Sequence, residues 1–237
     1  MKFENTQVWG FEHAFRGMRN PLNSWDKSDS HPDYVGALKG YTECAYVIGK
    51  NDMQLCKKLI AGGSEHRKFL RQIFVSVDIT APLYWWKEFD TYKVGTVANS
   101  TSTMHKLATT PITLECFDTD DYDAKLAVSI DGDYGYTMQR AISSMLENLE
   151  TIRVNYLQTK DKKYWKELVR WLPEGWLQKR TVTLNYENLL TIYKQRKAHK
   201  LNEWSGLDYH DKPNFIEWML GLPYMVEFIN AAYGSDE

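Results

Sequence analysis

The chain has 237 residues, which suits one large domain or two small ones and is enough to bury a sizeable core. Its formal net charge of −2 argues against nonspecific nucleic-acid binding. The start of the chain lacks the apolar region of a signal peptide, and no uninterrupted apolar stretch reaches the roughly 18 residues of a membrane span. Three cysteines without a Cys-x-x-Cys spacing indicate reduced thiols rather than disulfides or a zinc site. We therefore expect a cytoplasmic protein with no membrane partner and no bound metal.

The spacing of apolar residues and the turn residues predict the elements of the first part of the chain. From Phe74 the sequence alternates between apolar and polar residues, which is typical of a strand. Asn51 or Asp52 can cap a helix that ends at the next glycine pair. In chain order we expect a strand or short helix over 1–16, an ordered loop over 17–32, a helix over 33–48, a helix over 53–61, a strand over 74–79, and an aromatic helix over 83–92 opened by Pro82.

The second part of the chain is predicted to be mainly helical. Residues 94–105 are small and polar, which predicts a loop or a helix start. Acidic residues at 118–123 lack the glycine and distal glutamate of an EF-hand loop, so we interpret them as a solvated turn. Asp131-Gly132-Asp133 is typical of a hairpin turn. We expect helices over 137–157, 161–171 and 214–232, the last bent or split at Gly221 and Pro223.

Residues 180–204, RTVTLNYENLLTIYKQRKAHKLNEW, contain the most informative pattern. If this segment forms a helix, the following residues fall within roughly 40° of one line along its surface: Asn185, Leu189, Ile192, Arg196, His199 and Glu203. An arginine, a histidine and a carboxylate thus share a stripe with apolar residues, where an unpaired charge is expensive. Two interpretations stay open: an amphipathic helix with a salt-bridged edge, or an anion-binding wall with Arg196 as a phosphate fork.

Residues 62–107 carry a second set of motifs. They contain Glu65-His66-x-x-Phe69 and then Ala81-Pro82 before the aromatic helix. Together with the pattern at 172–204, these motifs resemble the flavin-dependent thymidylate synthases, the ThyX family. The resemblance covers about a third of the chain. It implies an α+β fold in a single domain over 1–237, with a central, mostly antiparallel sheet flanked by long helices.

The chain departs from the family at its Arg-His-Arg-x-x-Ser-x-Asn-x-x-Ser-x-Arg signature. The three leading cations fall on Thr91, Tyr92 and Lys93, and the first serine falls on Thr96. With one inserted residue, the signature's Asn-x-x-Ser falls on Asn99 and Ser102, and its last arginine on Met104. Of the signature's cations, only Lys93 is left.

The resemblance implies a flavoenzyme that uses FAD, with NADPH and methylenetetrahydrofolate as co-substrates, to convert dUMP to dTMP at C5 of the pyrimidine. It also implies a homotetramer with shared active sites. Arg196 would be the catalytic residue and would bind the pyrimidine nucleotide with His199 and Asn202. The cofactor would be bound by His66, Lys93, Thr96, Asn99, Ser102 and Asn185. Small donors with a cation suit the two phosphates of FAD on chemical grounds as well.

Alternative interpretations accompany these residues. The Ser/Thr-rich segment fits a helix cap, and His66 fits a structural histidine. Trp85 and Trp86 fit a core or subunit interface better than a stacking platform. Arg19 could replace a missing arginine in the pocket. The altered signature leaves two other functions open: a related flavoenzyme acting on a different pyrimidine nucleotide, and a non-catalytic nucleotide-binding oligomer with a degenerate site.

Overall fold

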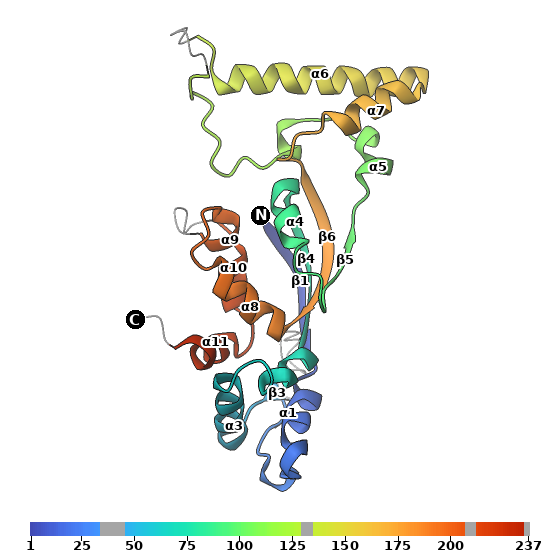
Figure 1. Cartoon of the computed structure of the whole chain (residues 1–237). Coiled ribbons are helices and arrows are strands. Elements are labelled where there is room, and N and C mark those ends of the chain that lie inside the picture. Colours follow the sequence, from blue (N-terminus) through green and yellow to red (C-terminus); the bar gives the residue numbers. More distant parts are fainter. Residues whose placement is uncertain (34–45, 129–134, 207–211, 235–237) are drawn as a thin grey trace. The chain divides into compact units, whose positions relative to one another are not determined.

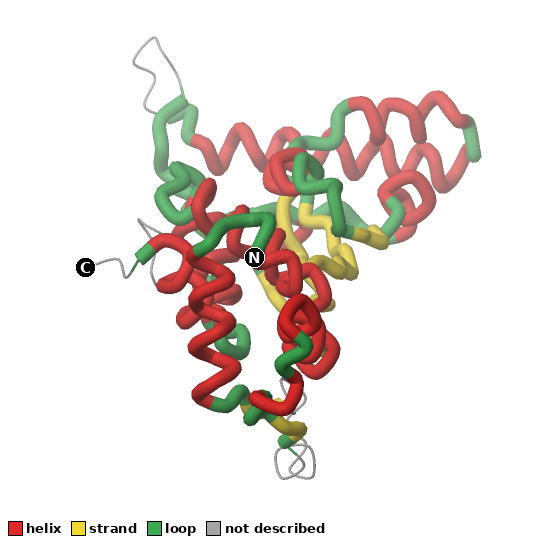
Figure 2. Tube along the Cα trace, turned by 60° about the horizontal axis from the view of Figure 1, so that its bottom comes forward, coloured by secondary structure: helices red, strands yellow, loops and turns green. Residues whose placement is uncertain are grey.

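A computed structural model describes residues 1–33, 46–128, 135–206 and 212–234. Helix is the commonest element among them, and the strands occupy a smaller part of the chain (Figure 2). The chain forms two compact units. The first unit contains Met1–Ile79, Asp90–Asn99 and Arg180–Glu237, and the second contains Thr80–Phe89 and Ser100–Lys179.

The main sheet has four strands in the order β1-β4-β6-β5. Their bounds are Lys2–Trp9 for β1, Phe74–Pro82 for β4, Leu177–Asn185 for β6 and Val97–Ser100 for β5. Side-chain pairs show that β4 and β6 are antiparallel, because Thr181 bonds to Asp78 and Thr183 bonds to Ser76. The expected α+β class with an antiparallel sheet is therefore confirmed.

Alternation of polar and apolar residues explains the two central strands. In β4, Val75, Val77 and Ile79 are buried while the residues between them are partly exposed, as the sequence pattern predicts. In β6, Val182 and Leu184 are buried in the same way. The prediction that a helix already includes Asn185 is therefore wrong, because residues 177–185 pair in the sheet.

In the first unit, short helices lie on one side of the sheet and at one end of its strands (Figure 1). Their bounds are α1 Phe11–Arg19, η1 Asn20–Leu22, η2 Trp25–Lys27, α3 Lys50–Ala61, η3 Arg67–Gln72, α8 Tyr186–Arg196, α9 Asn202–Ser205, α10 Phe215–Leu220 and α11 Met225–Tyr233. Two short strands, β2 (His31–Pro32) and β3 (Tyr46–Val47), pair in antiparallel fashion. An aromatic cluster fills much of the core: Phe11, Phe15, Tyr46, Phe69, Tyr186, Tyr224 and Phe228.

The second unit is built on a helical hairpin. Its helices are α4 Leu83–Phe89, α5 Thr103–Lys106, η4 Leu107–Thr109, η5 Leu114–Cys116, α6 Met138–Thr159 and α7 Lys162–Arg170. The long α6 packs along α7 (Figure 1). Their core contains Ile112, Phe117, Leu149 and Leu168. Arg153 of α6 is nearly buried and donates to the carbonyl of Ala108 at 3.2 Å, which ties α6 to η4.

Several local predictions are confirmed. These are the helices near 53–61, 137–157 and 161–171, the helix after Pro82, and the split of the last helix between Leu220 and Met225. The helix predicted over 33–48 lies outside the described residues at 34–45 and is wrong at Tyr46–Val47, which form β3. The turn predicted at 131–133 also lies outside the described residues. Among the residues that the structure describes, no helix is long and apolar enough to cross a membrane.

Candidate functional site

Helix α8 starts at a well-defined cap. Asn185 ends β6 in extended backbone, and its side-chain oxygen accepts a hydrogen bond from the Asn188 backbone N–H at 3.0 Å. The Asn188 side chain accepts in return from the Asn185 N–H at 3.3 Å, which completes a capping box. Leu189 and Ile192 are fully buried, as the stripe predicted. The switch from strand to helix therefore places Asn185 at a fixed, nearly buried position.

Segment 92–96 lies along α8, although it comes about ninety residues earlier in the sequence. The Asn188 side-chain amide donates to the Val94 carbonyl at 2.8 Å. Gly95 has a left-handed backbone with φ +74°, and a Cβ at this position would lie 2.7 Å from Nδ2 of Asn185. Glycine is therefore required here both by the backbone and by the close approach to the cap. Residues from the two regions that carry the ThyX resemblance, 62–107 and 172–204, thus lie side by side.

Arg196 is the last residue of α8 and is partly buried. Its Nε donates to the Tyr92 hydroxyl at 2.8 Å. The guanidinium carbon lies 5.7 Å from the ring centre of Tyr92 and 4.8 Å from that of Trp204. The Tyr92 hydroxyl donates onward to Oε1 of Gln195 at 2.9 Å. The guanidinium is therefore in contact with two aromatic rings and one hydroxyl.

His199 and Asn202 lie beyond the end of α8, so the helical stripe does not extend to them as predicted. The His199 ring accepts a hydrogen bond at Nδ1 from the Leu201 N–H at 3.1 Å. Its ring centre lies 6.4 Å from that of the fully buried Trp204, which also contacts Arg196. Asn202 is the first residue of α9. A turn and a shared tryptophan, not one helix face, therefore bring His199 near Arg196.

The residues predicted to form a phosphate loop have different environments. Lys93 is exposed, and Asn99 is exposed on β5. The Thr96 hydroxyl is buried without a hydrogen-bond partner. Ser102 belongs to the second unit and caps α5 by accepting from the His105 N–H at 3.1 Å. Ser102 thus has the structural role that its helix-cap interpretation describes, while Lys93 and Thr96 belong to the segment beside α8.

His66 lies at a hollow of about 500 Å³ in the first unit. The hollow is lined by Gly17, Met18, Asn20, Pro21, Leu59, Glu65, His66, Lys68, Phe69 and Gln72. The His66 ring packs against Gly62, where a Cβ would come within 3.1 Å of it. The next residue, Arg67, pairs with Glu187 in the first turn of α8 at 3.0 Å. The residue that follows His66 is therefore tied to the start of α8.

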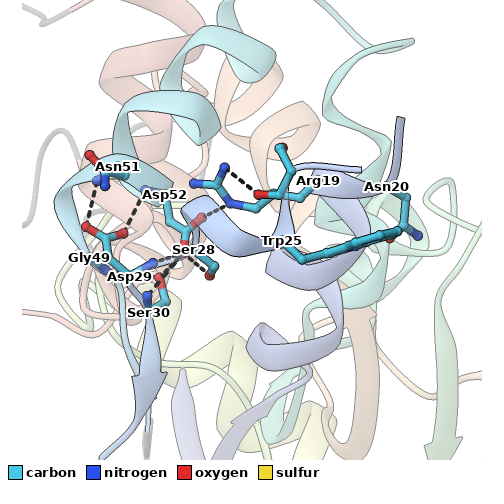
Figure 3. Close-up of polar contacts among 10 residues, drawn as sticks. Arg19, Asn20, Trp25, Ser28, Asp29, Ser30, Gly49, Asn51 and Asp52 are labelled. Carbon is cyan, nitrogen blue, oxygen red and sulfur yellow. Dashed lines mark hydrogen bonds and ion pairs between the residues drawn. The ribbon is translucent and has the colours of Figure 1, made fainter. Parts of the chain in front are cut away.

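Arg19 does not reach this hollow as a replacement cation, and that hypothesis is wrong. Its side chain is only 5% exposed, and its Nε lies 2.6 Å from Oδ1 of Asp52 (Figure 3). Its Nη1 donates to the Ser24 carbonyl at 3.2 Å. The guanidinium is therefore committed to a buried ion pair that anchors α1 to α3.

Asp52 is the centre of this buried cluster and does not cap α3. Its Oδ2 accepts hydrogen bonds from the hydroxyls of Ser28 and Ser30, each at 2.6 Å. Burial raises the pKa of Asp52, but the hydrogen bonds from these serines and from Arg19 outweigh it, so the pKa lies below the ordinary value. The cap comes from a distant residue, because the Asp29 carboxylate accepts from the N–H groups at the start of α3 (Figure 3).

The other residues considered as site candidates are buried or bonded to other residues of the protein. Trp85 and Trp86 are fully buried and in edge-to-face contact, as their core interpretation predicts. Asp118 accepts a hydrogen bond from the Tyr84 hydroxyl at 3.0 Å. Burial raises the pKa of the Cys56 thiol, which makes it an unreactive core residue. In the described part of the chain, no three His, Cys, Asp or Glu residues are grouped so that they could hold a metal ion.

The comparisons with known proteins concern the fold. No family model and no curated protein sequence matches the chain. The solved structure of the flavin-dependent thymidylate synthase ThyX from Helicobacter pylori, complexed with FAD and dUMP, superposes with a TM-score of 0.61 at 13% identity over 97% of both chains. A second structure of ThyX from Helicobacter pylori with FAD and dUMP has a TM-score of 0.62 at 14% identity, covering 98% of this chain and 100% of that chain. The chain therefore has the ThyX fold.

A weaker likeness is to the UMP/dUMP methylase PolB from Streptomyces cacaoi bound with 5-Br dUMP. Its TM-score is 0.48 at 14% identity, covering 80% of this chain and 76% of that chain. This likeness is too low to support an argument about the chain.

Four residues of the site were not singled out as site residues by the sequence pattern: Tyr92, Asn188, Gln195 and Trp204. One of them left a signal, because Asn185-x-x-Asn188 has the spacing of a capping box. Tyr92 contacts Arg196 across 104 residues, and no local spacing reports such a contact.

Proposed function

We propose that this chain is a thymidylate synthase-like flavoprotein that binds FAD and a pyrimidine nucleotide and transfers a one-carbon unit to C5 of the pyrimidine. The proposed reaction converts dUMP to dTMP, with methylenetetrahydrofolate and NADPH as co-substrates. The ThyX fold over nearly the whole chain supports the proposal, because the similar proteins from Helicobacter pylori were solved with FAD and dUMP. Fold alone does not establish activity, so the proposal depends on the site.

The observation that carries the proposal is the placement of segment 92–96 beside α8. At one end of the helix, the Val94 carbonyl and Gly95 contact the capping box of Asn185 and Asn188. At the other end, Tyr92 holds Arg196. Polar groups that could bind the two ends of a nucleotide-like ligand thus line one helix of the first unit.

The residues of this segment fit a phosphate-bearing cofactor. The Thr96 hydroxyl is buried without a partner in the protein, which costs free energy unless a further group supplies one. Lys93, three residues earlier, adds an ammonium group exposed to solvent. We assign Lys93, Thr96 and Asn99 of the first unit to the phosphates of FAD. Ser102 is assigned to the cofactor by the resemblance alone, because its hydroxyl caps α5. FAD would supply the redox and one-carbon chemistry that no side chain of this chain provides.

The remaining residues would position the reactants. His66 and Asn185 would line the flavin pocket, His66 from the hollow and Asn185 from the cap of α8. Arg196 would hold the pyrimidine or its phosphate, since a guanidinium can donate two parallel hydrogen bonds to such a group. His199 and Asn202 would complete the nucleotide site from the turn after α8. By the same resemblance we propose a cytoplasmic homotetramer with shared active sites, which sedimentation velocity would test.

One observation favours a second function. The Tyr92 hydroxyl occupies the Nε side of Arg196, and Tyr92 stands where the ThyX signature has its histidine. A site altered in this way suits a related flavoenzyme acting on a different pyrimidine nucleotide. It also suits a nucleotide-binding oligomer without catalysis.

The first test is the visible absorption spectrum of the purified full-length protein, before and after addition of FAD and desalting. We expect a retained flavin band and calorimetric binding of dUMP, followed by methylation of dUMP when the co-substrates are added. Flavin retention with binding of another pyrimidine nucleotide would move the assignment to the related flavoenzyme. Protein that retains no flavin and binds no pyrimidine nucleotide would overturn the proposal.

A matched pair of variants makes this test specific. Arg196→Lys keeps the positive charge but loses the planar fork, so we expect dUMP affinity to fall by about tenfold or more. Arg180→Lys is the control, because Arg180 is another arginine of the first unit and pairs with the Asp90 carboxylate at 2.8 Å. Equal effects of the two substitutions would argue against a role of Arg196 in binding.

A further inference from the structure

We infer that Tyr92 is a positioning residue, which fixes the orientation of the Arg196 guanidinium for nucleotide binding. This inference rests on the proposed function and deepens it, because it gives a role to a residue that replaces a signature cation. Tyr92 itself would not touch the nucleotide.

The Tyr92 hydroxyl makes two hydrogen bonds, one as acceptor and one as donor. The hydroxyl accepts from Nε of Arg196 at 2.8 Å and donates to Oε1 of Gln195 at 2.9 Å. Because Gln195 uses the hydroxyl proton, the oxygen lone pairs are directed to Arg196. The hydroxyl is thus oriented as an acceptor, and it fixes the Nε edge of the guanidinium.

Two aromatic rings lie close to the guanidinium and restrict its movement. Its carbon lies 4.8 Å from the ring centre of Trp204 and 5.7 Å from that of Tyr92. The two rings are nearly perpendicular, with an interplanar angle of 69°, so together they restrict rotation in more than one direction. Trp204 is fully buried and is itself packed against Phe215. Tyr92 and Trp204 together form a brace for Arg196, and Trp204 anchors this brace in the core of the first unit.

Preorganisation explains why such a brace matters. A free arginine side chain loses rotamer entropy when it is immobilised. A brace that immobilises Arg196 in the fold removes this loss from the binding step, so affinity improves without any new contact to the ligand.

The test is a double-mutant cycle on dUMP affinity, measured by calorimetry with full-length protein. Tyr92→Phe removes the hydroxyl and keeps the ring. We expect it to weaken dUMP binding by about tenfold in the otherwise unchanged protein. In the Arg196→Lys background we expect less than about a twofold further loss, because lysine has no Nε–H donor to position.

The matched control is Tyr233→Phe. The Tyr233 hydroxyl donates to the Leu190 carbonyl of α8 at 2.9 Å, so this variant also loses a hydroxyl contact to α8 but none to Arg196. We expect it to leave dUMP affinity unchanged. A merely structural role of Tyr92 would instead weaken binding equally in both Arg196 backgrounds, or make Tyr92→Phe and Tyr233→Phe alike, and either result would overturn the inference.

A ligand-free measurement separates this inference from the proposed function. We expect the Nε–H signal of Arg196 in a nitrogen-detected NMR spectrum to exchange slowly with water, and to exchange faster in Tyr92→Phe. If the wild-type protein retains no flavin and binds no pyrimidine nucleotide, the proposed function fails by that result alone, and the positioning role fails with it. If dUMP binds and neither its affinity nor the Nε–H exchange changes in Tyr92→Phe, only the positioning role fails.

Discussion

Two arginines of the first unit, Arg19 and Arg196, occupy contrasting environments. Arg19 is 4% exposed and bonded to the Asp52 carboxylate, whose remaining lone pairs accept from serines and backbone N–H groups. Arg196 is partly buried and held by a hydroxyl and two aromatic rings. A carboxylate partner uses the charge to hold elements of the fold together. The hydroxyl of Tyr92 and the rings of Tyr92 and Trp204 restrict the guanidinium of Arg196 at the end of α8.

The largest expected effect comes from breaking the buried pair. Asp52→Ala leaves Arg19 as an uncompensated buried charge and removes the acceptor of two serine hydroxyls. We expect the free energy of unfolding to fall by about 3–5 kcal/mol, measured by urea denaturation. Arg19→Met should cost less, because the serine and backbone donors to Asp52 remain. If Asp52→Ala costs less than Arg19→Met, the cluster is not organised around the carboxylate.

Lowering the pH should remove part of the same stabilisation. The fold lowers the pKa of Asp52, so its contribution is fully present above the unfolded pKa of about 3.9 and is lost as the pH falls through the folded pKa. Hydrogen bonds from Arg153 lower the pKa of Glu150 and act in the same direction. Unfolding free energies should therefore be flat near neutral pH and decline below about pH 4. Parallel pH profiles for wild type and Asp52→Asn would contradict the assignment to Asp52.

A smaller effect is expected at Gly95, in the segment 92–96 that lies beside α8. Gly95→Ala forces a side chain into a left-handed backbone and against Asn185, so we expect a loss of about 2 kcal/mol or more in unfolding free energy. Gly63→Ala is the control, because Gly63 has φ +95° with no atom within 4 Å of a Cβ. It should show the backbone strain alone. If both variants lose the same stability, segment 92–96 is not in tight contact with the cap.

The smallest expected effect is at the cap itself. Asn185→Ala removes the side-chain acceptor for the Asn188 N–H and should lower the unfolding free energy by about 1 kcal/mol. Asn185→Ser keeps an acceptor and should lose less. Thermal denaturation of the two variants checks this order. The opposite order would mean that the amide of Asn185 matters more for its other contacts than for the cap.

Local patterns in the sequence determined much of the fold. The alternation after Phe74 gave β4, because a half-buried strand needs a period of two. The break predicted at Gly221 and Pro223 separates α10 from α11, since proline lacks the N–H that a helix requires. Leu189 and Ile192 were placed in the core from their spacing alone. The stripe singled out Asn185, Arg196 and His199, the resemblance supplied the other residues of the binding proposal, and the roles of all of them stay predictions.

Only the tertiary structure decided which partners these local elements found. Residues 177–185 pair in the sheet because β4 provides a hydrogen-bonding neighbour, and the helical pattern applies only after Asn185. The Asp29 carboxylate caps α3 from more than twenty residues away. Tyr92 meets Arg196 across 104 residues. Spacing along a chain shows which residues share one face of a single helix or strand. Contacts between distant segments depend instead on the packing of the whole unit.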